Sequence, residues 1–204
     1  FLEFLREITM QYGALLIFDE VITGFRLALG GAQEYFQITP DLTALGKIVG
    51  GGMPIGAYGG RREIMELVAP SGPVYQAGTL SGNPAAVSAG IETLRILKSD
   101  SMIYERLNQK ARRISESAKK AAGGRICVNQ IGSLIGIFFT ERQVKDYEGA
   151  LSSDPAKYAD YFGYLLDRGI YVAPSQFEAM FVSDAHTEED IERTCKTIAS
   201  YFLK

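Results

Sequence analysis

An aspartate and a lysine, Asp19 and Lys47, are the residues of this sequence best placed to do chemistry together. Each follows a short apolar run, residues 14–18 in the first case and 42–45 in the second. The two residues are 28 positions apart, about the span of one strand–helix–strand unit, so the runs are expected to be neighbouring parallel strands. Ligands of open α/β sheets bind outside the carboxyl ends of the strands, and a carboxylate and an amine would therefore share one crevice.

This pair suits the chemistry of pyridoxal 5'-phosphate. A lysine amine condenses with the aldehyde of that cofactor, and an aspartate beside the ring nitrogen keeps it protonated, so that the ring withdraws electrons. The pair alone leaves an alternative open, because an aspartate that caps a turn and a solvated loop lysine could have the same spacing.

The residues around the pair carry a resemblance to a known family. The segment IFDEVITGFR, residues 17–26, resembles the strand-end motif of class III (subgroup II) aminotransferases, and PDLTALGKIVGGGMPIGA, residues 40–57, resembles their lysine segment. The resemblance implies an α/β fold of the fold type I pyridoxal-phosphate transferases. It also implies that Lys47 holds the cofactor, which passes through its pyridoxamine form, and that Asp19 pairs with its ring. Val21 would pack on the ring face, although a plain core role is equally open.

A third segment, AGTLSGNP at residues 77–84, is similar to the family segment that reaches the cofactor phosphate of the neighbouring subunit. Gly78 would bring its backbone N–H close to the phosphate, and Thr79 would add a hydroxyl and an N–H. The resemblance thus implies a homodimer with active sites shared between subunits. A glycine-rich turn that leads into a helix is an alternative reading, and both can hold.

Near the C-terminus, Glu178 distinguishes between members of the family. The segments PSQFEA (174–179), FVS (181–183) and AHT (185–187) resemble an aminomutase subgroup, with Met180 where that pattern has glycine. Many related aminotransferases carry an arginine in this domain to bind a substrate α-carboxylate, whereas a glutamate repels a carboxylate and attracts an amine. The resemblance implies an amino-aldehyde substrate and intramolecular amino transfer in tetrapyrrole (haem and chlorophyll) biosynthesis. An ω-aminotransferase of the same family and an inactive fragment that keeps the fold are the alternatives, and a solvated loop carboxylate is the alternative for Glu178.

The spacing of apolar residues, together with glycines, prolines and helix caps, predicts the helices and strands that carry these residues. A boundary near Ser99 would divide the chain into the C-terminal part of a cofactor-binding large domain with a mostly parallel sheet (residues 1–98) and a small α+β domain (99–204). Apolar residues at helical spacing, with their caps, predict helices near 1–11, 32–36, 61–68, 84–98, 102–122, 154–168 and 187–203. Short apolar runs predict strands near 14–18, 42–45, 126–129, 134–139, 170–172 and 179–182.

Composition excludes several classes of protein. The 204 residues carry a net charge of −3, which offers no basic surface for nucleic acid. No run of eighteen apolar residues exists, and two distant cysteines with one histidine, His186, do not make a metal site. His186 is expected to be structural, and the roles of Glu20 and Arg26 stay open. A cytoplasmic location is expected, or a plastid stroma in a plant or alga. Since family members are about twice this length, the chain is expected to be a C-terminal half.

Overall fold

The computed structural model describes residues 1–203 and divides into two compact units, Phe1–Ser101 and the part from Met102 onward. Their assignment as part of a cofactor-binding large domain and a small C-terminal domain, with a boundary near Ser99, stays a prediction.

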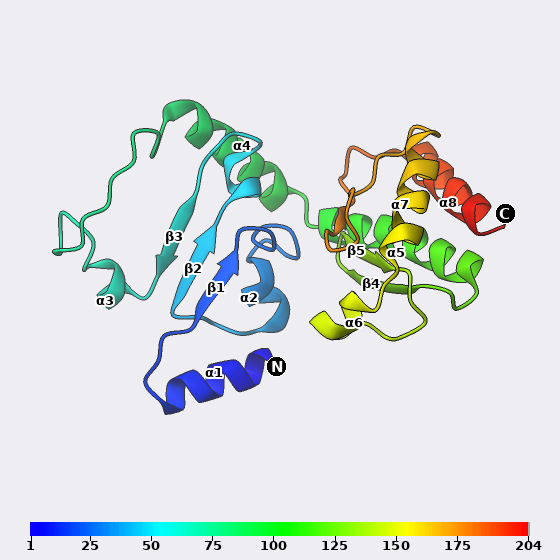
Figure 1. The fold of residues 1–204 in the computed structure, drawn as a ribbon. Coiled ribbons are helices and arrows are strands. Elements are labelled where there is room, and N and C mark those ends of the chain that lie inside the picture. The colour runs from blue at the N-terminus through cyan, green and yellow to red at the C-terminus, as the bar shows by residue number, and fades with distance from the viewer. Residues whose placement is uncertain (204) are drawn as a thin grey trace. The chain divides into compact units, whose positions relative to one another are not determined.

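The first unit is built on a three-stranded sheet of order β1-β2-β3 (Figure 1). Strands β1 (Ile17–Glu20) and β2 (Leu42–Leu45) are parallel, as predicted, whereas β3 (Ala57–Gly60) is antiparallel to β2. The helical elements of this unit are α1 (Leu2–Gln11), α2 (Gly31–Phe36), the 3₁₀ turn η1 (Lys47–Gly50), α3 (Arg62–Met65) and α4 (Pro84–Ser99).

Helix α1 packs its predicted apolar face against the start of the sheet. Leu2 and Leu5 contact a small buried cluster of Leu16, Phe18 and Ile38. The first strand departs from prediction, because it begins three residues later than the apolar run and buries only alternate side chains. Phe18 and Glu20 are buried, while Ile17 and Asp19 are exposed. Only one face of β1 is therefore covered in the described residues, and Phe18 on that face packs in the cluster that Leu2 and Leu5 contact.

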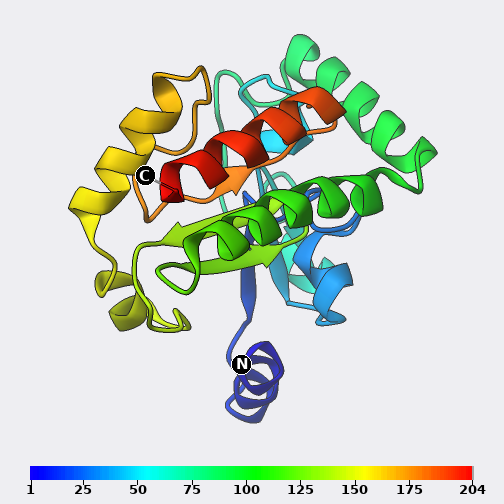
Figure 2. The ribbon, with the colours of Figure 1, turned by 90° about the vertical axis from the view of Figure 1, so that its right-hand side faces the viewer.

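The second unit contains the larger core. Strands β4 (Cys127–Ile131) and β5 (Leu134–Phe138) form an antiparallel pair. Helices α5 (Ile103–Ala122) and α8 (Glu188–Phe202) lie alongside each other on this pair, as Figure 2 shows. The buried face of α5 includes the small residues Ala111 and Ala118, and α8 adds Ile191 and Ile198. The other elements are α6 (Tyr147–Leu151), α7 (Pro155–Leu166) and β6 (Met180–Phe181).

The predicted caps are present in the structure. The Asn83 side chain accepts a hydrogen bond from the Ala86 N–H at 2.9 Å at the start of α4. Thr187 forms a capping box with Asp190 at the start of α8, and Asp154 caps α7 in front of Pro155. These side chains satisfy backbone donors that the first helical turn leaves without a partner.

The structure differs from the predicted elements in two places. Residues 170–172 do not form the predicted strand, and strand β3 was not predicted. The buried residues of α4 are Ala86 and Gly90, two small residues. None of the described helices is long and apolar enough to cross a membrane.

Candidate active site

The parallel pairing of β1 with β2 places Asp19 and Lys47 at the same end of the sheet. Asp19 pairs with Ala44, and Glu20 pairs with Leu45, the last residue of β2. Lys47 follows two residues later as the first residue of η1. Both side chains are exposed, so each is accessible to a ligand at the carboxyl ends of these strands.

The backbone at Lys47 has an uncommon conformation. Its φ is 49°, in the left-handed region that non-glycine residues rarely occupy. Such conformations persist only where surrounding structure holds them, and they are concentrated at functional sites. Gly46, just before it, is extended, and a Cβ at that position would lie 3.2 Å from Cγ1 of Val21. Val21 therefore lies over the link between β2 and Lys47.

Asp19 is held by a short local turn. Its Oδ1 accepts a hydrogen bond from the Val21 N–H at 3.0 Å. This bond fixes the direction of the carboxylate and of the chain that leads to Val21. The structure thus brings together three of the predicted site residues, Asp19, Val21 and Lys47, around one strand end.

Glu20 has a role that sequence reasoning left open. Its carboxylate is 1% exposed and accepts four hydrogen bonds, two at each oxygen. Oε2 accepts hydrogen bonds from the Ala32 N–H (2.6 Å) and the Thr23 hydroxyl (3.0 Å). Oε1 accepts hydrogen bonds from the backbone N–H (3.1 Å) and the side-chain amide (3.0 Å) of Gln33. Glu20 therefore ties the start of α2 to the strand that carries Asp19.

The approach of α2 to Glu20 requires a glycine. A Cβ on Gly31, whose φ is 71°, would overlap with the Glu20 carboxylate. The glycine pair that precedes Ala32 in the sequence is the signal that could have revealed this contact, because it marks a close approach of backbone to another group.

Arg26 and Lys47 line one open cavity of about 510 Å³. The remaining lining comes from residues 48 and 52–55, which carry no acidic side chain. Burial lowers the pKa of the Arg26 guanidinium. Two cationic side chains on one cavity favour an anionic ligand.

Gly78 and Thr79 lie in an exposed turn. The Ser81 N–H donates to the Gly78 carbonyl at 3.0 Å, and the Asn83 amide closes the turn on Leu80. This turn leads directly into α4, so the alternative that the segment is a glycine-rich turn before a helix is confirmed. Its predicted contact with a phosphate stays a prediction.

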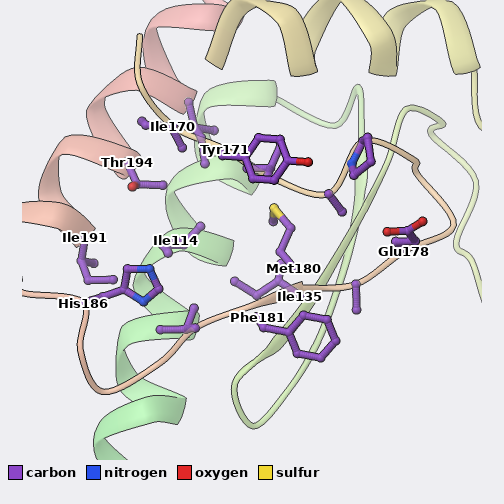
Figure 3. A pocket seen from close by; sticks show the side chains of 16 residues that line it. Ile114, Ile135, Ile170, Tyr171, Glu178, Met180, Phe181, His186, Ile191 and Thr194 are labelled. Atoms are coloured by element: carbon purple, nitrogen blue, oxygen red, sulfur yellow. The ribbon is translucent and has the colours of Figure 1, made fainter. Parts of the chain in front are cut away.

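Glu178 belongs to the second unit and lines an apolar pocket of about 510 Å³. Figure 3 shows Glu178 at one end of this pocket, His186 at the other, and the Met180 side chain between them. Met180, which stands where the family pattern has glycine, contacts the core and occupies part of this space. Burial first, and the Glu178 charge second, raise the pKa of Tyr158 to about 12.

His186 has the structural role that was expected. Its Nδ1 accepts a hydrogen bond from the Ser183 N–H at 3.0 Å, which closes the turn before the cap of α8. Among the described residues, no cluster of histidine, cysteine, aspartate and glutamate could hold a metal ion.

Comparison with known proteins identifies the family. The family model of class III aminotransferases matches residues 1–200. The chain belongs to the class III aminotransferase family. Fold type I, the architecture expected from the sequence, agrees with the solved structures that this chain resembles.

Three proteins illustrate the range of the family. The chain is 60% identical to glutamate-1-semialdehyde 2,1-aminomutase of Pelotomaculum thermopropionicum, over 99% of this chain and 47% of the relative. An ω-transaminase structure from Sphaerobacter thermophilus has a TM-score of 0.87 at 33% identity, over 99% of this chain and 47% of that one. A transaminase structure with bound pyridoxal phosphate has a TM-score of 0.84 at 29% identity, over 99% and 47%. The chain spans about half the length of the curated relatives it matches.

Proposed function

We propose that this chain carries the lysine and aspartate of a pyridoxal-phosphate-dependent aminomutase that converts glutamate-1-semialdehyde into 5-aminolevulinate, a precursor of tetrapyrroles. The observation that carries the proposal is the placement of Asp19, Val21 and Lys47 around the end of a parallel strand pair. The 60% identity to an aminomutase supports the choice of reaction.

The side chains at this strand end fit the proposed cofactor. When bound, pyridoxal phosphate supplies an electron sink next to the substrate carbon. The Lys47 amine would hold the cofactor covalently and move protons between neighbouring carbons. The Asp19 carboxylate would keep the ring nitrogen protonated, and Val21 would cover one ring face.

The second unit would contribute the recognition of the substrate. The Glu178 carboxylate is exposed at the pocket rim and would attract the ammonium group of an amino-aldehyde. It offers nothing to a carboxylate, in contrast to the arginine of an ordinary aminotransferase. Gly78 and Thr79 would hold the cofactor phosphate of a second subunit, in a homodimer with shared active sites.

The stoichiometry of the reaction provides a direct test of the proposed function. Substrate and product contain the same atoms, because the amino group and the carbonyl oxygen exchange places on neighbouring carbons. An aminomutase therefore needs no separate amino acceptor. We expect the intact gene product, loaded with cofactor, to form 5-aminolevulinate from glutamate-1-semialdehyde alone. Absence of this product would refute the proposed reaction.

An ω-aminotransferase is the second candidate, because a solved structure of an ω-transaminase shares the fold at 33% identity. Such an enzyme would turn over steadily only when an amino donor and a separate acceptor are both supplied. Strict dependence on that acceptor would favour this candidate. We propose the cytoplasm as the compartment, which is consistent with two free cysteines in a chain of this size.

A further inference from the structure

The left-handed backbone at Lys47 needs support from its surroundings. Lys47 is the first residue of the short turn η1, and Gly51, which follows the turn, has a φ of 57°. A turn of four residues has little stability of its own, because 3₁₀ hydrogen bonds have poor geometry. The direction of the Lys47 side chain therefore depends on what packs against the turn.

Helix α4 packs against this turn by backbone contact. A Cβ on Gly90 would overlap with the Val49 carbonyl oxygen. A Cβ on Gly51 would lie 2.5 Å from the Ala89 carbonyl oxygen and overlap with the Thr93 hydroxyl. Real Cβ atoms essentially never approach other atoms closer than 3.0 Å. Since the obstructing groups are mostly backbone atoms, they cannot move aside without moving the helix or the turn.

Gly90 is costly for the helix and so requires a packing reason. Glycine in a helix interior is less favourable than alanine, because it loses more backbone freedom on folding. Gly163 in α7 is different, because a Cβ there would meet nothing within 4 Å. Gly90 is buried within α4, whereas Ile91, next to it, is 46% exposed. The face of α4 that contacts the turn therefore allows a close approach of the two backbones and does not bury a large apolar side chain.

We propose that Gly51 and Gly90 are positioning residues, which let α4 lie against η1 and thereby fix the Lys47 amine where it meets the cofactor aldehyde. This inference rests on the proposed function, in which Lys47 holds the cofactor. Neither glycine lines the cavity that Lys47 shares with Arg26, so each would act through the turn.

Two matched pairs of variants test the inference in the intact gene product. Gly90→Ala is compared with Gly163→Ala, since both place alanine inside a helix. Gly51→Ala is compared with Gly123→Ala, since φ is 57° at the first position and 58° at the second, where the surrounding space is open. The measured quantity is the rate of covalent attachment of pyridoxal phosphate, trapped with borohydride and located by peptide mass spectrometry.

We expect attachment at Lys47 to slow by about tenfold or more in both crowded variants and by less than about twofold in both controls, since a misplacement of about 1 Å can cost as much as a hundredfold. A second readout separates positioning from general damage. In a Lys47→Ala background, Gly90→Ala should leave the noncovalent affinity for pyridoxal phosphate unchanged.

The outcomes distinguish the inference from the proposed function. If the parent protein attaches no cofactor at Lys47, the proposed function fails. If the parent attaches it and the crowded variants do so at the rate of their controls, the inference alone is overturned. A loss of noncovalent affinity in the Lys47→Ala background would also overturn it, because the glycines would then support the whole site. Where Gly90→Ala does not fold, the comparison of Gly51→Ala with Gly123→Ala decides.

Discussion

Replacing Glu20 with glutamine is expected to loosen the start of α2 and the strand that carries Asp19. Each carboxylate oxygen of Glu20 accepts two hydrogen bonds, and the group is 1% exposed. A glutamine has one acceptor oxygen and one NH₂ group. In either orientation of the amide, the NH₂ would face two donors, and one of these is a backbone N–H from Ala32 or Gln33.

The size of the effect follows from these contacts. A buried donor without an acceptor costs about 1–3 kcal/mol. Two donors lose their acceptor, although the side-chain donor of each pair can turn toward solvent. We therefore expect Glu20→Gln to lower the free energy of unfolding by about 2–4 kcal/mol.

Glu34 provides a matched control at the same end of α2. Its Oε2 accepts one hydrogen bond, from the exposed Gly30 N–H at 2.6 Å. A glutamine can keep that bond through its remaining oxygen, so Glu34→Gln should cost less than about 1 kcal/mol. Urea unfolding of the intact gene product gives the global effect, and hydrogen exchange of residues 28–37 gives the local one. If Glu20→Gln and Glu34→Gln lowered the free energy of unfolding equally, the buried hydrogen bonds of Glu20 would not have the stabilising role assigned to them.

Three further results are expected. The Asp41 carboxylate accepts a hydrogen bond from the Leu16 N–H and pairs with Arg6 and Arg61. These contacts, the Leu16 bond foremost, lower the pKa of Asp41 to about 2. The stability contributed by this ionised group is complete above its unfolded pKa of about 4 and is lost as the pH falls toward about 2. The stability difference from Asp41→Asn, measured by denaturant unfolding, should shrink over that range, and a constant difference would contradict this. Asn83→Ala should cost about 1 kcal/mol by the same measurement, while Asn83→Ser should cost much less. Glu178→Gln should lower kcat/KM for glutamate-1-semialdehyde by about tenfold, because roughly one hydrogen bond to a charged group is lost. The rate of cofactor attachment at Lys47 should not change.

The sequence predicted the parallel pairing of β1 and β2, because the spacing of the two apolar runs is that of one strand–helix–strand unit. It did not predict that β1 buries only alternate side chains, since a continuous apolar run is typical of a strand covered on both faces. It did not predict β3, since Ala57 and the two glycines of that strand have no apolar alternation. That strand is held by backbone pairing to β2, which leaves no pattern in side-chain type. Residues 170–172 have the composition of a strand but pair with no other strand, and they line the pocket beside Met180.

The same limit applies to α4 and to the site. Periodicity selects large apolar side chains, whereas α4 contacts the lysine turn through Gly90, a residue with no side chain. The placement of Asp19 and Lys47 at the carboxyl ends of β1 and β2 could be predicted from their spacing and flanking motifs. The hydrogen bonds of Glu20 could not, because three of the four join the strand to Ala32 and Gln33, twelve and thirteen positions later, through a turn whose path the sequence pattern does not specify.

In the proposed function, Lys47 is the lysine that holds the cofactor at the strand end beside Asp19. The most direct test is borohydride reduction of the intact gene product with pyridoxal phosphate, followed by mass spectrometry of its peptides. We predict one labelled peptide, with the modification on Lys47, and its disappearance in Lys47→Arg. A label on another lysine, or a labelled Lys47→Arg variant at the same stoichiometry, would contradict the account.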